Sequence, residues 1–139
     1  MIPFRVLSHT ADVRLRVFGH HYEELFKNAA LALASVLVKE SAGRRKEPLG
    51  GYEKIRVEGQ DINILLVNFL NEVLAQSQIN RKVYEKVKFL KLSGKDLEAQ
   101  IFGRPIEDFE EDVKAVTYHD VSISQNARGI WETTLTLDI

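Results

Sequence analysis

Two segments of the chain repeat apolar residues at the spacing of an amphipathic helix. The first set is Tyr22, Leu25, Phe26, Ala29, Ala30, Leu33 and Leu37. The second set follows Asp61, which predicts a helix N-cap, and consists of Ile62, Leu65, Leu66, Phe69, Leu70, Val73 and Leu74. Because both helices have a broad apolar face, each needs a sheet or another helix to cover it.

Other segments alternate apolar and polar residues, which is the pattern of half-buried strands. The alternation is clear in residues 13–17, 54–57 and 97–101. The Ser-Gly-Lys-Asp sequence at 93–96 predicts a hairpin turn, and a second hairpin is expected to join residues 114–124 to residues 130–137. Residues 113–121 are predicted to form one strand. This strand would point His119 and Asp120 to opposite faces, which argues against a shared metal ion at this dipeptide.

The predicted order is two strands, a helix, a strand, a helix and four further strands. Helices early and hairpins late favour an α+β fold over a doubly wound parallel one. We therefore expect a two-layer sandwich, with two amphipathic helices packed on a mixed, largely antiparallel sheet. A length of 139 residues with 45% hydrophobic content predicts a single domain, residues 1–139.

Composition excludes several classes of protein. With 19 basic and 20 acidic residues, the net charge of -1 favours neither a nucleic-acid-coating nor a membrane-surface protein. The absence of cysteine excludes disulfides, thiolate zinc sites and cysteine nucleophiles. No signal-peptide or membrane-spanning stretch is found, so we expect a soluble, cytoplasmic protein. Phosphate-loop, dinucleotide and nucleophile-elbow motifs are also missing, which argues against nucleotide chemistry by this chain alone.

Charge is nevertheless segregated locally. Residues 81–95 hold six basic residues and one acidic residue, Glu85. The simplest interpretation is a solvated strand face. The alternative is a basic patch for RNA or a partner, with Lys82, Lys86 and Lys88 as the candidate contacts.

The sequence ends in two adjacent carboxylates, the side chain of Asp138 and the α-carboxyl of Ile139. Strand phase places Asp138 on the polar face of its strand, and it places Asp12 in phase with Arg14 and Arg16. If these strands are neighbours, the aspartates share a surface that suits a hard cation. Taken one by one, the residues have simpler interpretations: Asp12 as a turn residue or cap, and Lys114 as an ion-pair partner.

Several motifs together resemble the archease family, in order and over essentially the whole chain. The matching segments are Ser8-His9-Thr10-Ala11-Asp12, Leu25-Phe26 with Ala29-Ala30, Phe69-Leu70-Asn71-Glu72, Lys114-Ala115-Val116-Thr117-Tyr118-His119 and Asp138-Ile139. One departure is Arg14, where the family has a small residue. This change bears on the shape of the pocket beside Asp12.

The resemblance implies a protein that is not itself an enzyme but activates an RtcB-type RNA ligase in tRNA splicing. Such activators promote guanylylation and turnover of the ligase and broaden its nucleotide use. The resemblance also implies a divalent cation, calcium with magnesium or manganese as alternatives, bound by Asp12, Asp138 and Ile139. It implies that Lys114 contacts the ligase or its nucleotide, with the neighbouring residues His9, Thr10 and His119.

Two other functions stay open at this stage. The second hypothesis is a chaperone-like or RNA-binding modulator of a tRNA-modifying enzyme. We expect tRNA to be contacted weakly or indirectly, and we expect neither DNA nor a membrane as a partner. A metal-dependent hydrolase is the third hypothesis, and its candidate groups are Asp12, His9, His119 and Asp138. The missing phosphate-binding loop counts against it.

Overall fold

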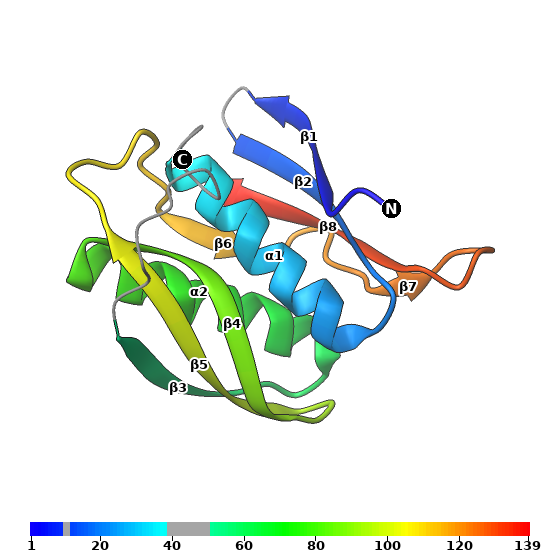
Figure 1. Ribbon diagram of the computed structural model, residues 1–139. Coiled ribbons are helices and arrows are strands. Elements are labelled where there is room, and N and C mark those ends of the chain that lie inside the picture. Colours follow the sequence, from blue (N-terminus) through cyan, green and yellow to red (C-terminus); the bar gives the residue numbers. More distant parts are fainter. Residues whose placement is uncertain (10–11, 39–50) are drawn as a thin grey trace.

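The structure is a computed structural model that describes residues 1–9, 12–38 and 51–139, with the side chains of Ser8 and His9 outside the description. Figure 1 shows its helices and strands. The elements are β1 (Phe4–His9), β2 (Asp12–Gly19), α1 (Tyr22–Leu37), β3 (Tyr52–Glu58), α2 (Ile62–Asn80), β4 (Lys82–Leu92), β5 (Asp96–Pro105), β6 (Ala115–Thr117), β7 (Ser124–Gln125) and β8 (Trp131–Asp138).

Both predicted helices are confirmed, and each begins at a side-chain cap. Asp61 caps α2 as expected, because its carboxylate accepts a hydrogen bond of 3.0 Å from the backbone nitrogen of Ile64. At the start of α1 the cap is His21, whose Nδ1 accepts a hydrogen bond of 3.2 Å from the backbone nitrogen of Glu24. None of the helices in the described ranges is long and apolar enough to cross a membrane.

The strands of the described residues form two antiparallel sheets. One sheet has the order β1-β2-β8-β6, with β7 also paired to β8, and the other has the order β3-β5-β4. Helix α1 packs against β2 and β4, and α2 packs against β3, β4 and β6, so both helices contact both sheets. The predicted α+β class, with two helices on antiparallel sheet, is confirmed. Its strands are divided between two sheets, and the apolar core lies where the helices meet them.

The two predicted hairpins differ in outcome. The turn at residues 93–95 does join β4 to β5 as an antiparallel hairpin. The prediction of one strand over residues 113–121 is wrong, because β6 ends at Thr117 and Asp120 adopts a left-handed backbone with φ of 60°. From the expected hairpin arm, residues 114–124, β6 and the short β7 that begins at Ser124 pair with β8, at separate places along it. Residues 118–123 therefore form an irregular connection instead of a continuous strand.

Candidate functional site

The candidate site lies at the end of the larger sheet where β2 begins and β8 ends. Asp12 is the first residue of β2, Asp138 is the last residue of β8, and the two are register partners across the antiparallel pair. Residues that lie directly opposite each other point to the same face, with Cβ atoms about 4.5–5.5 Å apart. Asp138 is exposed and Asp12 is half-buried. The structure thus brings the two aspartates together on the polar face of the sheet.

Neither aspartate has a neutralising partner in the described part of the chain, where both lack an ion pair and a side-chain hydrogen bond. Like charges directly opposite each other are destabilising, so such a pair favours a bound cation. Carboxylate oxygens are the ligands that calcium and magnesium prefer. Residues 1–9, 12–38 and 51–139 hold no group of three or more His, Cys, Asp or Glu side chains that could bind a metal. The two aspartates alone are therefore an incomplete ligand set.

Lys114 and Ile139 lie beside this pair. The backbone nitrogen of Lys114 donates a hydrogen bond of 2.7 Å to the carbonyl oxygen of Asp138, and Ala115 is the register partner of Asp138 on its other side. Lys114 is exposed, whereas the half-buried Ile139 packs its side chain against the core. This packing fixes the backbone of Ile139, the residue that follows Asp138. The site therefore has one exposed lysine beside two carboxylates.

The last residue of β1 also lies at this end of the sheet. His9 is the last residue of β1, and its register partner is Val13. Thr10 and the side chain of His9 lie outside the described residues. Figure 1 shows the end of β1 and the start of β2 at the same end of the sheet as the end of β8, with the N-terminus at the far end of β1. The C-terminal strand thus ends beside the start of β2, and not beside the first residue of the chain.

His119 and Asp120 lie close to the site but differ from expectation. They follow β6 in an irregular connection, and His119 Nε2 lies 3.4 Å from Asp120 Oδ2. The prediction that they point to opposite faces of a strand is wrong, because the strand has already ended. Arg14 Nη2 lies 3.9 Å from the same carboxylate oxygen. Sequence reasoning missed this contact, since no sequence signal predicts the left-handed turn at Asp120.

Farther along this face, the remaining charged side chain of β2 is paired. Arg16 donates hydrogen bonds of 2.8 Å to Thr134 Oγ1 and of 2.7 Å to Glu132 Oε1. Asp120 and Glu132 thus each have an arginine as a positive partner. Asp12 and Asp138 lack such a partner among the described residues, so the negative charge of this face is concentrated at their end of the sheet.

The basic candidates lie elsewhere. Lys86 and Lys88 are exposed on β4, in the smaller sheet, on either side of the buried Val87. Lys82 is half-buried at the start of β4, beyond an irregularity in the pairing between Tyr84 and Lys86. The structure therefore separates these lysines from the aspartate pair, and it separates Lys82 from the other two.

Comparison with known proteins points to one family. The model of the Archease protein family (MTH1598/TM1083) matches residues 4–139. The chain is 36% identical to the protein archease of Pyrococcus abyssi (strain GE5 / Orsay), and the match covers 95% of each chain. The protein archease of Pyrococcus furiosus is also 36% identical, with 95% of each chain covered.

Solved structures agree. The solution structure of Methanobacterium thermoautotrophicum protein 1598 superposes with a TM-score of 0.76 at 28% identity, and it covers 99% of both chains. A crystal structure from Thermotoga maritima, described as an archease and possible chaperone, has a TM-score of 0.62 at 16% identity and covers 97% of this chain and 96% of that one. At that identity the second likeness concerns the fold alone.

Proposed function

The chain belongs to the archease family, and on this premise we propose that it is a non-catalytic partner protein that activates an RtcB-type RNA ligase in tRNA splicing. It promotes guanylylation of the ligase, allows multiple turnover and broadens nucleotide use. The reacting groups belong to the ligase, in keeping with the missing phosphate-binding motifs of this chain.

The observation that carries the proposal is the pair of adjacent carboxylates, which have no ion-pair partner among the described residues. Asp12 and Asp138 face each other in register, and Ile139, the third proposed ligand, follows directly in the sequence. An all-oxygen set of this kind suits calcium, magnesium or manganese better than zinc. Calcium takes six to eight oxygen ligands, so water or the ligase completes the shell. When bound, the cation neutralises the repulsion between the carboxylates and fixes this end of the sheet.

Lys114 is proposed to contact the ligase or its nucleotide. It is exposed, and its backbone is held to Asp138 by the hydrogen bond of 2.7 Å. An ammonium group at this place suits a phosphate oxygen, whose charge it stabilises. His119 is exposed nearby, and together with His9 and Thr10 it is proposed to line the same contact.

Multiple-turnover ligation tests this function. The cognate ligase is supplied with matched manganese and nucleotide, and product is followed with and without this protein. Stimulation is expected from the wild type, and weakened stimulation from Asp138→Ala and Lys114→Ala. The control Asp112→Asn removes an exposed carboxylate outside the site and is expected to leave stimulation intact. Ligation that is unchanged by the wild-type protein would exclude the proposed function.

A chaperone-like role for a tRNA-modifying enzyme is the second candidate; the Thermotoga maritima structure, which shares the fold, is itself described as a possible chaperone. It predicts that this protein suppresses aggregation of such an enzyme on heating. Equal aggregation with and without the protein would exclude this role and would leave ligase activation to be decided by the ligation assay.

A further inference from the structure

The smaller sheet has an outer face that the helices do not cover. Its inward side chains, among them Ile55, Ala99 and Val87, are buried in the core. The strand registers place the outward side chains in rows across β3, β5 and β4. The first two rows are Tyr52, Phe102 and Lys86, then Lys54, Gln100 and Lys88. We call these six residues the aromatic–basic face.

The first row presents two aromatic rings beside a positive charge. The ring centroids of Tyr52 and Phe102 are 5.5 Å apart, and Nζ of Lys86 lies 5.4 Å from the centre of the Phe102 ring. Tyr52 is 52% exposed. A large ring on the outer side of a sheet contributes nothing to the core, but it offers an apolar surface on which another planar group can stack.

The positive charge of this face is unpaired. Lys54, Lys86 and Lys88 form no ion pair with any residue in the described ranges, and the two rows contain no carboxylate. Successive rows on one face of a strand are about 7 Å apart. Three ammonium groups therefore gather within the width of this small sheet, next to the two rings.

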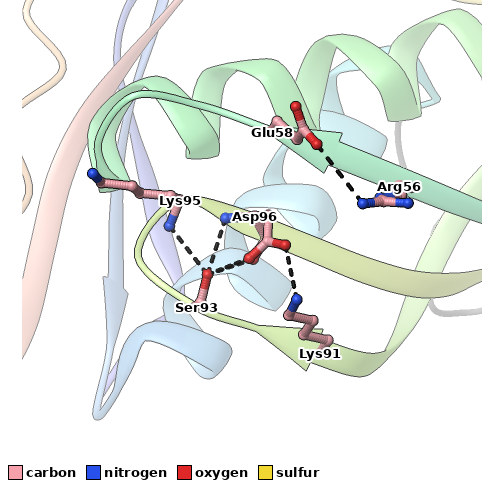
Figure 2. A network of polar contacts seen from close by, with 6 residues as sticks. All are labelled: Arg56, Glu58, Lys91, Ser93, Lys95 and Asp96. Carbon is pink, nitrogen blue, oxygen red and sulfur yellow. Dashed lines mark hydrogen bonds and ion pairs between the residues drawn. The ribbon is translucent and has the colours of Figure 1, made fainter.

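Figure 2 shows the polar contacts of the neighbouring residues near the β4–β5 turn. In the next rows, Arg56 Nη2 lies 3.8 Å from Glu58, and Lys91 Nζ lies 2.9 Å from Asp96. Ser93 donates a further hydrogen bond to the Asp96 carboxylate. Arg56 and Lys91 thus have acidic partners within the chain, whereas the lysines next to the rings are available for a ligand.

We propose that the aromatic–basic face binds a short stretch of single-stranded polynucleotide. Bases stack on Tyr52 and Phe102, and the phosphates contact Lys54, Lys86 and Lys88. Exposed aromatic residues on a sheet that stack two or three bases are a known mode of single-strand recognition, and basic residues alongside bind the backbone. An acidic peptide would need only the lysines and would leave the rings unused. This surface lies on a different sheet from the aspartate pair and does not depend on ligase activation.

Fluorescence polarisation with short labelled oligouridylate and oligothymidylate tests the role of the ring. Stacking is worth about 1–3 kcal/mol per base, so Tyr52→Ala is expected to weaken binding at least about fivefold, while Tyr52→Phe binds like the wild type. The matched control is Tyr118→Ala, which removes a tyrosine of similar exposure, 54%, away from this face. Thermal unfolding verifies that each variant is folded.

Salt dependence tests the lysines. Each phosphate contact of a single strand contributes about 0.7 to the slope of log affinity against log salt. Lys54→Gln/Lys88→Gln is expected to lower the slope by about 1.4, whereas Lys95→Gln in the β4–β5 turn leaves it unchanged. Binding of either oligonucleotide with this pattern supports the proposal. It is overturned if the wild type binds neither at low salt, if Tyr52→Ala binds as tightly as the wild type, or if polyglutamate competes as well as the oligonucleotides do.

Discussion

Replacement of Asp138 by asparagine is expected to change stability in opposite directions with and without calcium. Without a cation, Asp12 and Asp138 repel each other across the register pair. At about 5 Å in a water-like dielectric, this repulsion is about 0.8 kcal/mol. Because Asp138 is exposed, the water-like value is the suitable one. Asp138→Asn is thus expected to raise the free energy of unfolding by up to about 0.8 kcal/mol in the presence of a chelator.

With calcium the order reverses. A cation that binds only the folded state at 100 times its dissociation constant adds about 2.7 kcal/mol. For a domain of this size, each kcal/mol shifts Tm by roughly 3–4 °C, so the Tm of the wild type rises by about 8–11 °C. The variant keeps one carboxylate of the pair and is expected to gain much less. In calcium, the wild type therefore becomes the more stable of the two proteins.

Thermal unfolding followed by circular dichroism measures the Tm of the wild type and of Asp138→Asn, each in chelator and in saturating calcium. Asp112→Asn is the control, since it removes one carboxylate without touching the pair, and it is expected to respond to calcium like the wild type. The reasoning is refuted if calcium leaves the wild-type Tm unchanged, or if Asp138→Asn gains as much from calcium as the wild type does.

Three further predictions concern the fold itself. Arg104 is 2% exposed and its Nε lies 2.8 Å from Glu85 Oε1, so urea unfolding of Arg104→Ala should show a loss of about 3–5 kcal/mol; a loss below about 1 kcal/mol would contradict this. A Cβ at Gly19 would lie 2.7 Å from the Cα of Leu25, so Gly19→Ala is expected to lower the free energy of unfolding by about 1–3 kcal/mol in the same assay. An unchanged urea midpoint would contradict this prediction. Burial raises the pKa of Tyr84 above its ordinary value, so Tyr84 ionises at a lower pH in the unfolded chain than in the folded one. The free energy of unfolding should therefore fall as pH rises past about 10. Urea unfolding from pH 8 to 11 should show a smaller fall for Tyr84→Phe than for the wild type, and an equal fall in both proteins would contradict this prediction.

Local pattern was sufficient for the helices and for the faces of the strands. The cap at Asp61 and the apolar spacing of α1 and α2 are local features, and the structure confirms them. Alternation also placed Asp138 on the polar face, where it is exposed. These predictions succeed because helix and strand periods depend on neighbours along the chain.

The sequence pattern did not predict which strands pair. Alternation says which side of a strand is buried, but it does not say which strand lies beside it. The division into two sheets, the register of Asp12 with Asp138, and the contact of Tyr52 with Phe102 all join residues far apart in sequence. The strand predicted over residues 113–121 failed for a related reason. Its alternation continues past Thr117, but a left-handed backbone at Asp120 breaks the pairing with β8.

The central claim is that the Asp12–Asp138 pair holds a cation through which this protein activates an RNA ligase. The most direct test is the rate at which the cognate RtcB-type ligase becomes guanylylated, measured with labelled nucleotide in the presence of wild-type protein or of folded Asp12→Asn/Asp138→Asn. We predict clear acceleration by the wild type and little or none by the double variant. Equal acceleration by both proteins would contradict the account.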